Sequence, residues 1–75
     1  MVIVKKQLLV NLIELRLLIE LFLIENINIK DKIKDIIIIL MQMDSEKNYT
    51  NLLNYDKEQL LDFCNVNIDN LLKDF

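Results

Sequence analysis

The sequence contains no histidine, glycine, proline or alanine, and its single cysteine is Cys64. Without histidine the usual general base near neutral pH is missing, and catalytic arrangements of serine or cysteine with histidine cannot be built. Without glycine there is no phosphate-binding loop of the P-loop or dinucleotide type and no EF-hand calcium loop. One cysteine cannot form an intrachain disulfide or supply a four-ligand zinc site. We therefore expect no enzyme activity, no cofactor and no metal.

The chain is short and rich in apolar residues. Its 75 residues are 53% hydrophobic, and a domain of this size buries only about 60% of the surface that its unfolded chain exposes. Small folds usually need a disulfide, a metal or association to be stable, and the sequence offers no means of forming the first two. We expect residues 1–75 to form a single helical domain whose surplus apolar side chains are covered by another protein, by a second copy of the chain, or by both.

The charge is unevenly distributed along the chain. The formal net charge of −3 divides into +1 for residues 1–43, with six basic and five acidic side chains, and −4 for residues 44–75, with three basic and seven acidic ones. An acidic second half disfavours nonspecific binding to nucleic acid, which depends on the neutralisation of phosphates. It suits a basic partner surface, although a simple solvated acidic face is the plainer interpretation.

The first 25 residues resemble a signal or membrane segment only superficially. Glu14, Arg16 and Glu20 interrupt the apolar run, and each charge costs roughly 2.5–3.5 kcal/mol near the bilayer centre. No small-residue cleavage site follows. The lack of alanine beside abundant isoleucine, leucine, asparagine and lysine is typical of an AT-rich genome. We expect a soluble, cytoplasmic protein of a low-GC bacterium, or of a phage, plasmid or similar parasite.

Residues 3–25 are predicted to form one long helix with two apolar stripes, because apolar residues recur at helical spacing on two different sides. The first stripe contains Leu8, Leu12, Leu15, Ile19 and Phe22. The second stripe contains Ile3, Val10, Ile13, Leu17, Leu21 and Ile24. Polar ridges separate the two, and on one ridge Arg16 and Glu20 have the spacing of an ion pair. An ordinary surface helix has one stripe, so this helix is predicted to lie between its own domain and a partner.

Residues 28–43 are predicted to form a second helix, with Asn28 as its N-cap. Apolar residues follow at helical spacing: Ile29, Ile33, Ile36, Ile37, Leu40 and Met43. The β-branched run Ile36–Leu40 also permits a strand paired with Met1–Val4, but a lone pair of strands is marginal in water. In the favoured helix, Ile38 and Ile39 fall off the main face and indicate a second buried surface.

Residues 44–75 are predicted to form short helices with clear start signals. The first is capped by Asp44 or Ser45, and the second begins at Asp56, with Gln59 completing a capping box. The third follows a short turn and takes Asn67 as its N-cap. Together with the two longer helices, these segments predict an all-α bundle of about four to five helices.

Other polar and reactive residues are expected to have structural roles. Asp31 and Asp35 share a helical face but lie among lysines, so a solvated, self-compensating face is predicted there. Cys64 is expected to be a small core residue, unreactive because a buried thiol without a cationic neighbour stays protonated. Tyr49 and Tyr55 are expected to be half buried, with their hydroxyls in water.

These patterns predict a small regulator, inhibitor or immunity-type protein that acts by occupying the surface of another protein and that also associates with itself. Affinity would come from buried leucine, isoleucine and phenylalanine side chains. The residues predicted to contact a partner are Leu8, Val10, Leu12, Leu15, Leu17, Ile19, Leu21, Phe22, Ile38 and Ile39.

Two alternatives remain open. Residues 57–73 loosely resemble a helix-turn-helix, which implies a DNA-binding regulator dimerised by the first helix. Only Lys57 and Lys73 are basic in that window, and a recognition helix needs basic or amide side chains. Residues 2–24 could instead lie along a membrane surface, but apolar stripes on two sides of a helix do not fit a single interface.

Overall fold

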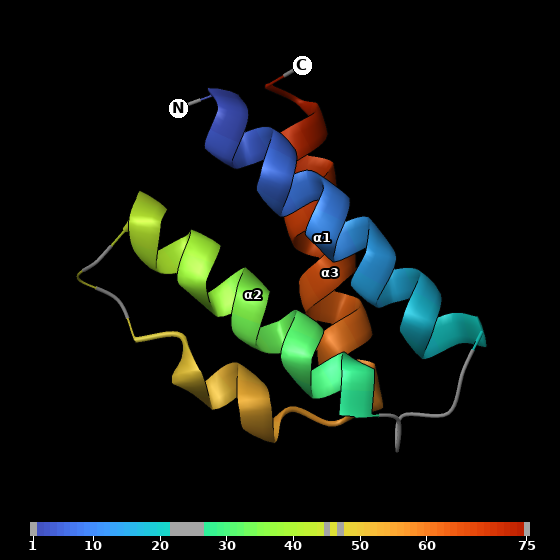
Figure 1. The fold of residues 1–75 in the computed structure, drawn as a ribbon. Coiled ribbons are helices and arrows are strands. Elements are labelled where there is room, and N and C mark those ends of the chain that lie inside the picture. Colours follow the sequence, from blue (N-terminus) through green and yellow to red (C-terminus); the bar gives the residue numbers. More distant parts are fainter. Residues whose placement is uncertain (1, 22–26, 45, 47, 75) are drawn as a thin grey trace.

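A computed structural model of the chain describes residues 2–21, 27–44, 46 and 48–74. These residues form three α-helices and one 3₁₀ helix: α1 (Val2–Leu21), α2 (Ile27–Met43), η1 (Thr50–Asn54) and α3 (Lys57–Leu72). Helix α1 packs against both α2 and α3, and η1 packs against α2. Figure 1 shows α1 crossing α3, with α2 alongside. The predicted all-α class is confirmed, but the predicted number of four to five helices is wrong.

Helix α1 supplies the centre of the hydrophobic core. Leu8, Leu12, Leu15 and Ile19 recur at intervals of four, three and four residues, which places them on one side of the helix. Each of these side chains is exposed by 2% or less. The first predicted stripe is therefore the inner face of α1, packed against the rest of the chain.

The run of four isoleucines in residues 36–39 is helical, as favoured over the strand alternative. Ile36, Ile37 and Ile39 are buried, whereas Ile38 is 56% exposed. Ile39 was predicted to belong to a separate surface, but it joins the same core. It lies seven residues after Lys32, on the side of α2 from which the Lys32 ammonium reaches α1. This side of α2 is therefore part of the core and not a separate surface. The helix begins at Ile27, which places Asn28 inside its first turn and not at the predicted cap.

The segment before η1 is held by local hydrogen bonds from short polar side chains. The Asn48 Oδ1 atom accepts hydrogen bonds from the Thr50 backbone N–H at 3.0 Å and from the Thr50 hydroxyl at 2.6 Å. The predicted cap at Asp44 or Ser45 is wrong, because η1 begins at Thr50 after Tyr49, which makes no side-chain cap. Leu52 anchors η1 in the core with 2% exposure.

Helix α3 begins at the predicted capping box. The Gln59 backbone N–H donates to Asp56 Oδ1 at 2.8 Å, and the Asp56 backbone N–H donates to Gln59 Oε1 at 3.0 Å. Both bonds satisfy N–H groups that the first turn of a helix leaves unpaired. From there the helix continues without interruption to Leu72.

The predicted turn before Asn67 is absent, and one helix replaces the two that were expected. Asn67 lies in the interior of α3, where its Nδ2 donates to the Phe63 carbonyl at 2.8 Å. An asparagine can bond either to an N–H ahead of it, as an N-cap, or to a carbonyl one turn behind it. Continuity is favoured because the buried face of α3 spans the predicted turn with unbroken helical spacing: Leu60, Cys64, Ile68 and Leu71.

The two start signals respond oppositely to alanine. Asp56→Ala is expected to lower the free energy of unfolding by about 1 kcal/mol, because it removes a true N-cap. Asn67→Ala is expected to leave stability within about 0.5 kcal/mol or to raise it, because alanine is the better helix former in a helix interior. Urea unfolding followed by circular dichroism measures both. A loss of about 1 kcal/mol for Asn67→Ala would contradict a continuous α3.

Candidate protein-interaction surface

The predicted contact residues separate onto opposite sides of α1. Leu8, Leu12, Leu15 and Ile19 lie in the chain's own core, and Ile39 of α2 lies there too. Phe22 lies outside the described residues. Val10, Leu17 and Leu21 face away from α2 and α3 and are exposed by 53%, 46% and 70%. The structure thus distinguishes the two stripes, which the sequence could not.

The second stripe forms an apolar surface that the rest of the chain leaves uncovered. It contains Ile3, which is 73% exposed, together with Val10, Leu17 and Leu21, and we call these four residues the α1 outer face. Ile13, at the edge of the stripe, is half buried and packs against the core. Single exposed apolar residues are common on protein surfaces, whereas several along one face of a helix make that face a candidate interaction site.

Polar contacts along both sides of α1 fix which way the outer face points. On the α2 side, the Lys32 ammonium lies 2.6 Å from Glu14 Oε2 and donates to Asn11 Oδ1 at 2.9 Å. On the α3 side, Arg16 Nη1 donates to Asn65 Oδ1 at 3.3 Å. Rotation of α1 about its axis would break these contacts, so α1 is held in one orientation over the core.

A further ion pair ties α1 to the end of the chain. Lys5 Nζ lies 2.9 Å from Asp74 Oδ2. Figure 1 accordingly shows the two chain ends at the same end of the molecule. Both side chains are partly exposed, so the pair contributes little free energy. It nevertheless holds the first turns of α1, and Ile3 with them, next to α3.

Two charged side chains beside the outer face have no partner among the described residues. Lys6 and Glu20 are both exposed and take part in none of the ion pairs or side-chain hydrogen bonds found in that part of the chain. The predicted Arg16–Glu20 pair is not formed, because Arg16 reaches Asn65 on α3 instead. Lys6 and Glu20 therefore carry opposite charges that no ion pair within the described part of the chain neutralises.

The first half of the α1 outer face has a shallow hollow. Ile3 and Val10 form its apolar floor, and its rim is polar: Lys6, Gln7, Asn11 and Glu14. An apolar strip with a polar rim is the usual composition of a protein–protein contact. The hollow is open and follows the helix, so it fits a partner side chain better than a small molecule, which prefers a more enclosed pocket.

Exposed apolar residues elsewhere do not form a comparable row. Ile38 and Met41 of α2 are 56% and 44% exposed, but charged Lys34 and Asp35 lie one turn before Ile38 on the same side of the helix. Ile38 and Met41 are three residues apart and span about one turn, so the predicted partner contact at Ile38 lies in a shorter apolar patch than the α1 outer face.

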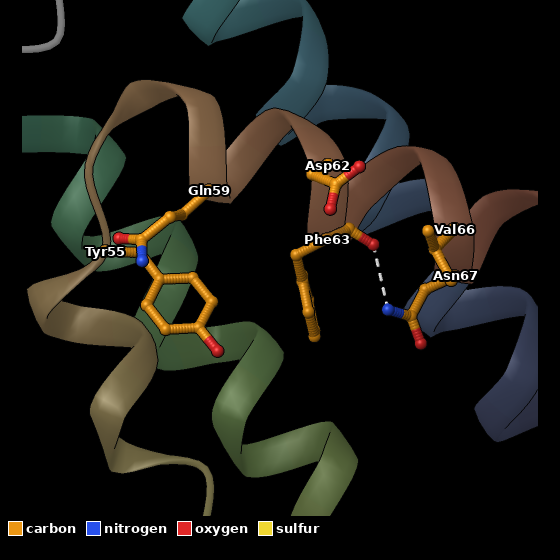
Figure 2. A pocket seen from close by; sticks show the side chains of 6 residues that line it. All are labelled: Tyr55, Gln59, Asp62, Phe63, Val66 and Asn67. Carbon is orange, nitrogen blue, oxygen red and sulfur yellow. Dashed lines mark hydrogen bonds between the residues drawn. The ribbon is translucent and has the colours of Figure 1, made fainter.

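A second, smaller candidate lies where η1 meets α3. An open pocket of about 300 Å³ is bounded by Tyr55 and Phe63 together with polar side chains of α3. Figure 2 shows the two rings on either side of the opening and the Asp62 carboxylate directed away from them. The ring centroids are 6.4 Å apart at an interplanar angle of 78°, an edge-to-face contact. This contact packs the first turns of α3 against the segment that follows η1. Tyr55 and Phe63 therefore each have a structural role.

The reactive groups of the described chain are few. Cys64 is fully buried, and burial raises the pKa of its thiol from 9.0 to about 11, against the smaller opposing effect of the Arg16 charge. No group of three or more acidic or cysteine side chains that could hold a metal occurs within the described residues. Tyr49 and Tyr55 are half buried, as predicted. Apolar contact is thus the main chemistry that this surface offers.

Comparison with protein-family models, with curated proteins and with solved structures finds no match for this chain. In the part of the chain that the structure describes, no helix is long and apolar enough to cross a membrane. Function must therefore be inferred from the α1 outer face and its surroundings.

Aspartate substitutions at Leu15 and Leu17 should distinguish the two faces of α1. Leu15→Asp is expected to unfold the protein, because it places a charge at a site that is 1% exposed. Leu17→Asp is expected to change the free energy of unfolding by less than about 1 kcal/mol, because it alters an exposed site. Far-ultraviolet circular dichroism in dilute solution checks both. A folded Leu15→Asp variant would contradict the assignment of the inner face.

Cys64 is expected to react slowly with thiol reagents at pH 8 while the chain is folded, and rapidly in denaturant. The folded state keeps the thiol proton up to about pH 11, whereas the unfolded chain loses it near 9.0. The stability linked to this group is therefore complete below pH 9 and is lost as the pH rises towards 11. Timed reaction with a chromogenic disulfide measures the reactivity. Equal rates with and without denaturant would show that Cys64 is accessible.

Proposed function

We propose that this chain is a small protein-interaction factor that regulates or inhibits another protein by occupying its surface, with the α1 outer face as the contact. The observation that carries the proposal is the row of four large apolar side chains on a helix whose opposite face already forms the core. A small domain gains nothing for its own folding from such a row. Its physical benefit arises only when another surface covers it.

The energetics support a specific but modest interaction. Full burial of a large aliphatic side chain contributes roughly 1.5–3 kcal/mol, and between 46% and 73% of each outer-face side chain is still available for burial. Four such side chains supply on the order of 4–7 kcal/mol before the entropic cost of association. Contacts at the polar rim therefore have to add affinity and select the partner.

The arrangement of the outer face favours a helical partner. Val10 and Leu17 are seven residues apart, so they lie on one line along α1. A second helix can lay its own apolar stripe along that line, as in helix-in-groove recognition and coiled coils. The partner surface is accordingly expected to present aliphatic side chains at intervals of three and four residues.

The DNA-binding alternative has no comparable support. Residues 57–72 form one uninterrupted helix, so this segment does not supply the two helices that a helix-turn-helix requires. The exposed side of α3 includes Asp62 and Asp69, whose charges oppose a phosphate backbone. We therefore propose no second function.

A capture experiment with matched variants tests the proposal. Immobilised wild-type chain, a Val10→Glu/Leu17→Glu variant and an Ile38→Glu/Met41→Glu control are each exposed to an extract of the source cells, and the retained proteins are identified by mass spectrometry. Both variants replace two exposed apolar residues of one helix. We expect a specific protein, or added copies of the chain itself, to be retained by the wild type and the control but not by the α1 variant.

Two results would contradict this function. Equal retention by all three chains would show that the α1 outer face is not the contact. No retained protein, together with a monomeric wild-type chain at high concentration, would show that the face has no protein partner at all.

A further inference from the structure

We propose that the α1 outer face binds a second copy of this chain, with the two α1 helices antiparallel and related by a two-fold axis near Ile13. This inference rests on the proposed function, because it assigns an occupant to the same surface. The argument uses the order of apolar and charged residues along the two edges of that surface.

The outer face has two distinguishable edges on either side of the line through Val10 and Leu17. At 100° per residue, one edge carries Lys6, Ile13 and Glu20, which we call the charged edge. The other edge carries Ile3, Gln7, Glu14 and Leu21. In an antiparallel pair with two-fold symmetry, each edge meets the same edge of the second copy, because the two-fold axis runs perpendicular to both helices.

On the charged edge, this symmetry joins opposite charges. Lys6 lies seven residues before Ile13, and Glu20 lies seven residues after it. An axis at Ile13 therefore brings Lys6 of one copy level with Glu20 of the other, and the reverse pair forms by symmetry. Between these two ion pairs, the two Ile13 side chains meet at the axis. Neither Lys6 nor Glu20 has an ion-pair partner among the described residues of one chain, so both are available for this contact.

The same register joins the exposed apolar residues. Val10 of one copy lies about one residue from the level of Leu17 of the other, an offset of about 1.5 Å along the helix. Ile3 lies within about 3 Å of the level of Leu21 of the second copy. All four of these side chains are at least 46% exposed in the single chain, and each finds an apolar neighbour in the pair.

One like-charge contact in this register is already compensated. The two Glu14 side chains lie close to the axis on the other edge, between Gln7 and Leu21, where bare carboxylates would repel each other. Each Glu14 carboxylate is 2.6 Å from the Lys32 ammonium of its own chain. The repulsion across the interface is therefore largely neutralised before the two copies meet.

A parallel pair does not fit these residues. In a parallel two-fold pair, the charged edge meets the opposite edge of the second copy at the same height. Ile13 then lies against Glu14, and Glu20 lies against Leu21, so Ile13 and Leu21 each face a carboxylate. The antiparallel arrangement avoids these contacts and is favoured for that reason.

The interface is small, which sets the expected affinity. Stable interfaces bury about 800 Å² on each partner, and a single helix face of four apolar side chains falls below that value. We therefore expect a dimer that dissociates with a Kd in the micromolar range, about 1–100 µM. Sedimentation equilibrium should show the mass rising from 9.0 kDa towards twice that value with concentration.

Charge reversal tests the register. Lys6→Glu places two carboxylates together at both pairs, and Glu20→Lys places two ammonium groups together, so each variant alone is expected to dimerise about tenfold or more weakly than the wild type. An equimolar mixture of the two variants forms opposite-charge pairs again, and its association is expected to return to within about threefold of the wild type. Lys34→Glu, an equivalent reversal on exposed α2, is the control and should leave the Kd unchanged.

Cross-linking tests the orientation. In an Ile3→Cys/Leu21→Cys variant, a short bismaleimide is expected to join the two copies, because the register brings residue 3 near residue 21 of the second copy. Ile3→Cys alone is expected not to cross-link, because the two copies of residue 3 lie about 30 Å apart in the antiparallel pair. Cys64 is buried and does not compete. Efficient cross-linking of Ile3→Cys alone would overturn the antiparallel arrangement.

The outcomes separate this inference from the proposed function. A chain that is monomeric at millimolar concentration but captures another protein through Val10 and Leu17 overturns the dimer and leaves the function standing. A dimer that charge reversal at Lys6 and Glu20 does not weaken also overturns the inference. If the chain is monomeric and also captures no protein through the α1 outer face, both the dimer and the proposed function are overturned.

Discussion

The packing of the α1 side chains Leu12 and Leu15 into the hydrophobic core is the contact on which the rest of the structure depends. Helix α1 lies against both α2 and α3, so its inner face joins the two halves of the molecule. Lys32 from α2 and Asn65 of α3 contact opposite sides of α1, and these contacts prevent the helix from turning. Because the inner face packs into the core, the second apolar stripe on the opposite side of α1 points outward. The exposed apolar surface is therefore a direct consequence of how the core is built.

Local signals in the sequence predicted those parts of the fold that depend on near neighbours. The capping box of Asp56 and Gln59 is a contact between residues three apart, so it can be recognised without knowing the fold. The helical periodicity of residues 29–43 likewise outweighed the strand preference of the isoleucines, because the pattern extends beyond them on both sides. Cys64 was predictable as a core residue from its spacing to Leu60 and Ile68.

Features that depend on distant contacts were predicted only in part. Two stripes on α1 were visible in the sequence, but which one is internal depends on where α2 and α3 lie. Ile39 was assigned to a separate surface because it lies off the main apolar face of α2, and the sequence does not show which side of that helix packs into the core. Asn67 was taken for a cap because an asparagine can bond forwards or backwards along a helix. Glu20 was not recognised as lacking a partner among the described residues, because Arg16 was expected to pair with it and instead reaches α3.

The order of the helices along the chain also has a consequence for synthesis. Helix α1 is made before α2 and α3, yet its inner face is covered in part by α3, which leaves the ribosome after both. At roughly 5–20 residues per second, α3 is completed a few seconds after α1. Both apolar stripes of α1 are exposed during that interval. A nascent chain in that interval exposes an apolar helix of the kind that chaperones bind. Neighbouring nascent chains on one polysome can also contact each other through the α1 outer face, which stays exposed in the folded protein.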